Sequence, residues 1–107
     1  MNDMLPLSIV IPVYNEGEHI RSTIDSLKKN VSSKNEIIVI YDHEQDTTVP
    51  VLEDICLHDA SVQMIKNNLV PGPSGAIRTG INHSLGNKIL VTMADMSDDH
   101  TQINKMM

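Results

Sequence analysis

The chain has 107 residues, the length of one domain, and 40% of them are hydrophobic, so the composition excludes a disordered protein. The formal net charge is −6, no basic run exceeds the pair Lys28-Lys29, and only 2% of residues are aromatic, which together exclude the basic and aromatic surfaces of nucleic-acid-binding proteins. A single cysteine, no signal peptide and no long apolar run exclude an internal disulfide and a membrane span, and predict a cytoplasmic location.

The first half of the chain predicts two buried strands and the helix between them. Residues 7–12 form a β-branched run that Pro12 ends, and residues 36–41 form a second such run. Between them, apolar residues recur at helical spacing up to Val31, and Asn15 is expected to cap this helix.

The second half repeats the same alternation. A helix is expected to start at Thr47 or Thr48, followed by a short edge strand at residues 61–65. A further helix is expected over residues 75–85, and a last strand over residues 88–93.

Alternating strands and helices predict an α/β fold: a Rossmann-like parallel sheet of about four strands with helices on both faces. We expect residues 1–107 to form a single domain. A four-stranded sheet of this kind leaves one strand edge unpaired, so we also expect the chain to be a fragment of a longer domain and its open edge to favour a homo-oligomer.

Ligands of open parallel sheets bind beyond the carboxyl ends of the strands, and polar residues gather there in this sequence. Asp95 follows the last strand and suggests an oxygen ligand for Mg²⁺ or Mn²⁺, but taken alone it is better explained by a solvated turn that caps the next helix. Asp42 and Asp46 suit either contacts to a ribose or base edge, or helix capping. The segment Gly72–Arg78 suits either a phosphate at a helix N-terminus or a simple turn.

Four ordered blocks resemble family 2 glycosyltransferases with the GT-A fold, most of all enzymes similar to dolichyl-phosphate-mannose synthase. The blocks are residues 7–16 with Pro12-Val13-Tyr14-Asn15-Glu16, residues 36–46, residues 72–86 and residues 88–95.

The resemblance implies a transferase that binds a UDP- or GDP-linked sugar together with Mg²⁺ or Mn²⁺. By this similarity Pro12, Tyr14, Glu16 and Asp42 line the base and ribose pocket, Gly75 and Arg78 lie near the diphosphate, and Asp95 is the last Asp of the metal motif. It also implies that the catalytic base and the acceptor half follow residue 107, and that a full-length parent associates with a membrane or a lipid acceptor.

The sequence departs from the family pattern at two of these blocks. Tyr41 and His43 replace an Asp and a Gly in the second block, and Met93 replaces the first Asp of the metal motif. A thioether is a poor ligand for a hard cation. The alternative reading is therefore a non-catalytic nucleotide-binding or assembly module that keeps the fold. A phosphoryl-accepting receiver domain fits less well, because Asn15-Glu16 lacks a companion Asp.

Overall fold

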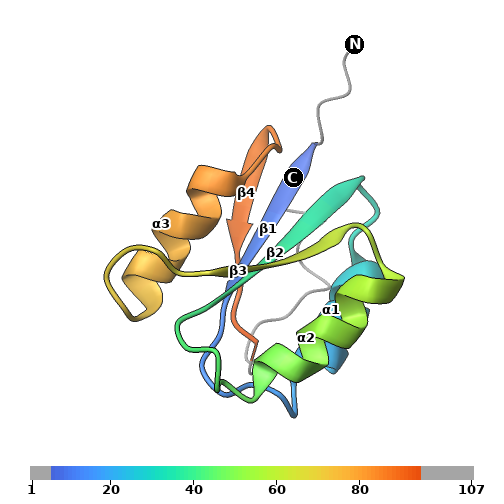
Figure 1. The fold of residues 1–107 in the computed structure, drawn as a ribbon. Coiled ribbons are helices and arrows are strands. Elements are labelled where there is room, and N and C mark those ends of the chain that lie inside the picture. The colour runs from blue at the N-terminus through green and yellow to red at the C-terminus, as the bar shows by residue number, and fades with distance from the viewer. Residues whose placement is uncertain (1–5, 95–107) are drawn as a thin grey trace.

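A computed structural model describes residues 6–94 of the chain (Figure 1). The elements follow one another as β1 (Leu7–Pro12), α1 (Ile20–Asn30), β2 (Asn35–Tyr41), α2 (Thr48–His58), β3 (Val62–Lys66), α3 (Pro73–His83) and β4 (Lys88–Val91).

The strands form one parallel sheet in the order β3-β2-β1-β4, with β1 and β2 in the centre. α1 and α2 cover one face of the sheet and α3 covers the other (Figure 1). The expected parallel α/β sheet with helices on both faces is confirmed, and the third strand lies at an edge as expected.

Both faces of the central strands are buried, which explains their uninterrupted apolar runs. Ile9 and Ile11 of β1 pack with α1 and α2, whereas Val10 between them packs with Ile38, Ile40 and Ala76 on the α3 side. Successive side chains of a strand point to opposite faces, so one six-residue strand serves two cores.

A buried carboxylate ties the amino-terminal end of the sheet together. Glu36 is 4% exposed and accepts hydrogen bonds from Ser8 Oγ (2.5 Å), Gln63 Nε2 (3.1 Å) and the backbone N–H of Leu85 (2.7 Å). These bonds join β2 to β1, to β3 and to the turn between α3 and β4, at the end of the sheet opposite the strand exits.

The expectation that Asn15 caps the first helix is wrong. α1 begins at Ile20 with His19 as its N-cap residue, and Asn15 lies in the preceding turn with a positive φ of 52°. Within residues 6–94, no helix combines the length and the apolar character that crossing a membrane requires.

Candidate functional site

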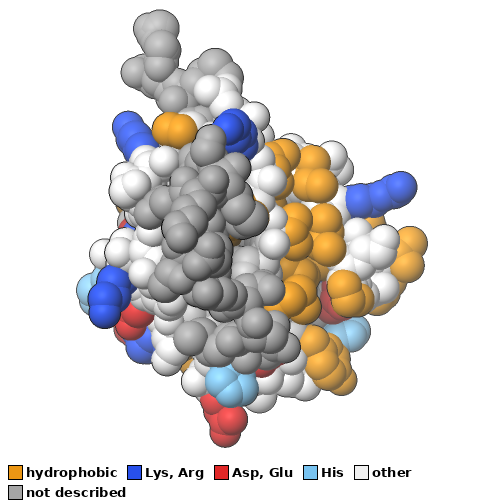
Figure 2. Space-filling model, turned by 180° about the vertical axis from the view of Figure 1, so that it is seen from behind, with side chains coloured by type: hydrophobic (Ala, Val, Ile, Leu, Met, Phe, Trp, Pro, Cys, Tyr) orange, Lys and Arg blue, Asp and Glu red, His pale blue; other side chains and the backbone are white. Residues whose placement is uncertain are grey.

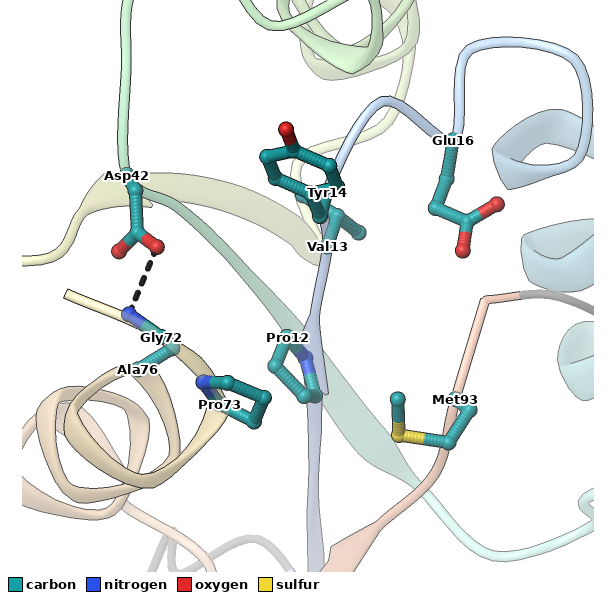
Figure 3. Close-up of a pocket in the computed structure, with 9 residues that line it drawn as sticks. All are labelled: Pro12, Val13, Tyr14, Glu16, Asp42, Gly72, Pro73, Ala76 and Met93. Carbon is teal, nitrogen blue, oxygen red and sulfur yellow. Dashed lines mark hydrogen bonds between the residues drawn. The ribbon is translucent and has the colours of Figure 1, made fainter.

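A cavity of about 280 Å³ opens at the carboxyl ends of the central strands (Figure 3). Its described lining comes from four segments that are distant in sequence. The lining residues are Pro12, Val13, Tyr14, Glu16, Asp42, Gly72, Pro73, Ala76 and Met93. We call this cavity the strand-exit pocket.

Parallel topology brings these segments together, because the carboxyl ends of all four strands meet at one edge of the sheet. The turn after β1 supplies Tyr14 and Glu16, Asp42 directly follows β2, and Met93 lies beyond β4. The first turn of α3 closes the pocket with Pro73 and Ala76.

Asp42 fastens the start of α3 to the end of β2. Its Oδ2 accepts the backbone N–H of Gly72 (2.8 Å; Figure 3), and its Oδ1 accepts Asn67 Nδ2 (2.7 Å). Gly72 has a φ of 108°, a left-handed conformation that favours glycine, so the tight entry into α3 depends on it. Asp42 therefore both lines the pocket and holds one of its walls.

The turn after β1 is fixed by the start of α2. Asp46 accepts the N–H of Asn15 with both carboxylate oxygens (3.0 Å each), and Thr48 Oγ1 accepts the N–H of Glu16 (2.8 Å). Asn15 Oδ1 in turn accepts the N–H of Thr47 (3.1 Å). These bonds link two loops about 30 residues apart and set the places of Tyr14 and Glu16.

The pocket combines apolar walls with two carboxylates. The Tyr14 side chain is 72% exposed, so one face of its ring is free to stack on a planar group. Glu16 and Asp42 can accept hydrogen bonds from N–H and O–H donors of a ligand. The described lining includes no Lys, Arg or His. Such a lining suits a heterocycle and a sugar better than a bare anion.

Four of the residues expected from sequence line this one pocket: Pro12, Tyr14, Glu16 and Asp42. Gly75 and Arg78 instead line a neighbouring pocket with Leu69, Val70 and Ser74. By helical geometry this pocket lies on the opposite side of α3 from Pro73 and Ala76. Asp95 lies outside the described residues.

The structure gives Gly75 a packing role that the sequence did not suggest, and it gives Asp46 the capping role that the sequence considered. A Cβ on Gly75 would lie 1.8 Å from the carbonyl oxygen of Val70, so this glycine permits close packing. Asp46 is 5% exposed, is not among the lining residues, and accepts the N–H of Thr48 (2.7 Å) at the start of α2. Of the two interpretations of Asp46, helix capping is the one that the structure supports.

Five further lining residues were not among the site residues expected from sequence: Val13, Gly72, Pro73, Ala76 and Met93. Three of them lie in the segment Gly72–Arg78 that was considered for phosphate binding, and Met93 occupies a position of the metal motif. The dipeptide Gly72-Pro73 could have indicated the start of a helix, because Gly followed by Pro is typical of a tight turn into a helix. Ala76 carried a weaker signal, since a small residue one turn into a helix lets a ligand approach.

The carboxylates of the described residues are not clustered for metal binding. They include no group of three or more His, Cys, Asp or Glu side chains placed to hold a metal ion. Glu16 and Asp42 lie on opposite sides of the Val13-Tyr14 segment in Figure 3, and the strand exit beside Glu16 presents the thioether of Met93. Hard cations prefer oxygen ligands, which a thioether does not supply.

Comparison with curated proteins gives glycosyltransferases among the relatives. The chain is 31% identical to an uncharacterised glycosyltransferase, YkcC, of Bacillus subtilis over 99% of its own length and 34% of that protein. It is 31% identical to the dolichyl-phosphate beta-glucosyltransferase of Homo sapiens over 94% of its own length and 34% of that protein. The chain thus spans about a third of the length of these relatives.

Solved structures share the fold. The mannosyltransferase PcManGT from Pyrobaculum calidifontis, in complex with GDP-Man and Mn²⁺, matches with a TM-score of 0.75 and 20% identity over 86% of this chain and 28% of that one. S. aureus TarS in complex with UDP-GlcNAc matches with a TM-score of 0.73 and 20% identity over 85% of this chain and 27% of that one. These likenesses confirm the partial GT-A fold.

The family model described as Glycosyl transferase family 2 matches residues 8–107, which is nearly the whole sequence. Sequence, topology and relatives agree, and the chain belongs to glycosyl transferase family 2.

Proposed function

We propose that this chain is the donor-binding portion of a glycosyltransferase and that the strand-exit pocket binds the nucleoside of a UDP- or GDP-linked sugar. The observation that carries the proposal is the convergence of Pro12, Tyr14, Glu16 and Asp42 on one cavity. Family neighbours support it, since PcManGT is complexed with GDP-Man and TarS with UDP-GlcNAc.

Each side chain has a role that follows from its chemistry. The exposed ring of Tyr14 stacks on the base, while Pro12 supports the other side of the site. The carboxylates of Glu16 and Asp42 accept hydrogen bonds from the ribose hydroxyls or from a base N–H. Bases with an N–H on their pairing edge, as in uracil and guanine, suit such acceptors.

The diphosphate is expected to extend toward the start of α3. The N-terminus of a helix attracts anions through its free N–H groups and its dipole. Ser74 and Gly75 lie in this first turn, and Arg78 lies one turn further along the same helix. Arg78 lies on the other side of α3 from the strand-exit pocket. We therefore expect it to stabilise the diphosphate through its positive charge and not through a direct hydrogen bond.

A divalent cation, Mg²⁺ or Mn²⁺, is the remaining part of the proposal. Asp95 is its candidate ligand, and a bound cation would neutralise negative charge on the diphosphate leaving group. Mn²⁺ accompanies the sugar nucleotide or nucleotide in complexes of PcManGT and of the glucosyl-3-phosphoglycerate synthase from Mycobacterium tuberculosis. The names of two relatives, which act on dolichyl phosphate and undecaprenyl phosphate, support a lipid-linked acceptor for a longer protein of this type.

Calorimetric titration with UDP and with GDP tests the proposal. We expect one of them to bind, and Tyr14→Ala to weaken binding by about 10-fold or more, because stacking of a base on an aromatic ring contributes about 1–3 kcal/mol. Leu57→Ala is the matched control, because Leu57 is 82% exposed on α2 and lies outside the pocket. Absence of binding by both nucleotides at millimolar concentration contradicts the proposal.

A further inference from the structure

Asp46 is a buried carboxylate whose hydrogen bonds all come from backbone N–H groups among the described residues. It is 5% exposed and accepts Asn15 N–H with both oxygens (3.0 Å each) and Thr48 N–H with Oδ1 (2.7 Å). Burying a charge is unfavourable unless strong hydrogen bonds offset the loss of water, and these bonds together with the α2 N-terminus provide that offset. Both oxygens of the Asp46 carboxylate are used as acceptors, so a side chain with a single acceptor oxygen could not make all of these bonds.

The N–H that Asp46 binds belongs to a residue in an uncommon conformation. Asn15 has a φ of 52°, and it is the only non-glycine residue with a positive φ in the described part of the chain. Asparagine adopts this region more readily than most residues with a side chain, but the conformation still costs free energy and is stabilised where the surroundings enforce it. Here the enforcement comes from Asp46 on the backbone of Asn15 and from Thr47 N–H on its side chain.

The enforced residue lies between two lining residues of the pocket. Tyr14 precedes Asn15 and Glu16 follows it, and Figure 3 shows the two side chains leaving the turn in different directions. Reversal of the φ of Asn15 would redirect the chain between them. The conformation of one non-lining residue thus determines whether ring and carboxylate face the same cavity.

We infer that Asp46 is a positioning residue for nucleotide binding: it holds Asn15 in the left-handed conformation that aims Tyr14 and Glu16 into the strand-exit pocket. This rests on the proposed function. Asp46 touches no ligand in this role; it acts through the backbone of the turn after β1.

Two substitutions of Asn15 isolate the backbone effect. Asn15→Gly and Asn15→Val remove the same side-chain bond to Thr47, but glycine adopts a positive φ readily and β-branched valine does not. We expect Asn15→Gly to keep the affinity for the nucleotide that the wild type binds, UDP or GDP, within about 3-fold. We expect Asn15→Val and Asp46→Ala each to weaken it by about 10-fold or more, and Asp46→Asn to fall between Asp46→Ala and the wild type.

A second buried carboxylate separates positioning from loss of stability. Glu36 is 4% exposed and also accepts several hydrogen bonds, but it lies at the opposite end of the sheet. Glu36→Ala should therefore lower the melting temperature at least as much as Asp46→Ala while leaving the dissociation constant unchanged, when titrations are run well below the unfolding transitions.

The outcomes distinguish the inference from the function on which it rests. If the wild type binds a nucleotide but Asn15→Val binds as well as Asn15→Gly, or Asp46→Ala as well as the wild type, the positioning role is wrong. Equal weakening by Glu36→Ala and Asp46→Ala overturns it too. If the wild type binds neither UDP nor GDP, the proposed function fails, and the inference falls with it.

Discussion

Met93 shows how one side chain can decide the electrostatics of the pocket. It lines the cavity at the exit of β4, two positions before Asp95, and is 38% exposed. Its thioether brings no charge and is a weak ligand for Mg²⁺ or Mn²⁺. A carboxylate at the same place would offer a hard cation an oxygen on the pocket side.

We therefore expect Met93→Asp to make nucleotide binding more dependent on Mn²⁺. Titration of UDP and GDP with Mn²⁺ and with EDTA should show a ratio of affinities about 10-fold larger in the variant than in the wild type, which equals about 1.4 kcal/mol. Met93→Leu, which keeps an apolar side chain of similar size, should show the wild-type ratio. An unchanged ratio in Met93→Asp would mean that this strand exit does not face the metal.

At the residue scale, pocket residues were predictable from the sequence when their position depends on the end of a single strand. Pro12, Tyr14, Glu16 and Asp42 lie at or within four residues of the carboxyl end of a central strand, so parallel topology was enough to bring them together. The role of Asp46 was not predictable in the same way. It depends on a contact with Asn15 across 31 positions, which neither loop's composition encodes alone.

At the scale of the elements, α3 contains two glycines whose neighbours leave no room for a side chain. A Cβ on Gly80 would lie 2.4 Å from Val10 Cγ1, and one on Gly75 would lie 1.8 Å from the carbonyl oxygen of Val70. Glycine in a helix is intrinsically unfavourable. Here Gly80 lets α3 approach β1, and Gly75 lets it approach the loop that precedes α3.

Gly75→Ala should destabilise the protein although alanine favours helices. The added methyl group meets backbone, which cannot rotate away, so we expect a loss of about 1–3 kcal/mol, typical of overpacking. Thermal unfolding followed by circular dichroism measures this. Ser74→Ala, in the same turn and exposed, is the control and should unfold at nearly the wild-type temperature.

The same variant tests the two interpretations of Gly75. If its function were close approach to a phosphate, Gly75→Ala would lose nucleotide affinity at an unchanged melting temperature. If its role is packing, Gly75→Ala should lower the melting temperature.

The strands and helices were predictable because the spacing of apolar residues and the length of each apolar run match the elements observed. Each expected strand lies within two residues of the observed one. For β1 and β2 the reason is that uninterrupted apolar runs suit strands buried on both faces. The start of α1 was not predictable, because Asn15 is a good capping residue by type. Its hydrogen bonds instead go to the start of α2, so α1 begins only at Ile20.

On the scale of the whole molecule, the two faces of the sheet are covered unequally. α3 lies over β1 and β2, and apolar side chains on α3, after it and on β4 remain exposed: Ile81 (43%), Leu85 (69%), Ile89 (42%) and Val91 (39%). Ile89 and Val91 share the sheet face of Val10, which packs with α3. Figure 2 shows hydrophobic side chains gathered on the β4 side of the molecule.

A patch of this kind on a small protein favours association. We expect the chain to self-associate through this face as concentration rises, which is the assembly alternative to a purely nucleotide-binding role. Light scattering over a concentration series should show a mass that increases in the wild type. The double variant Ile89→Lys and Val91→Lys should stay monomeric, because charged side chains block contact between such faces.

Leu57→Lys distinguishes association through this face from non-specific hydrophobic association. Leu57 is more exposed than Ile89 or Val91, but it lies on α2. This variant should associate as the wild type does. The double variant should still bind the nucleotide, since neither substituted residue lines the strand-exit pocket. A wild type that remains monomeric at all concentrations contradicts assembly through this face. Loss of binding together with association would instead mean that the pocket is completed by the partner, which would make assembly and donor binding one function.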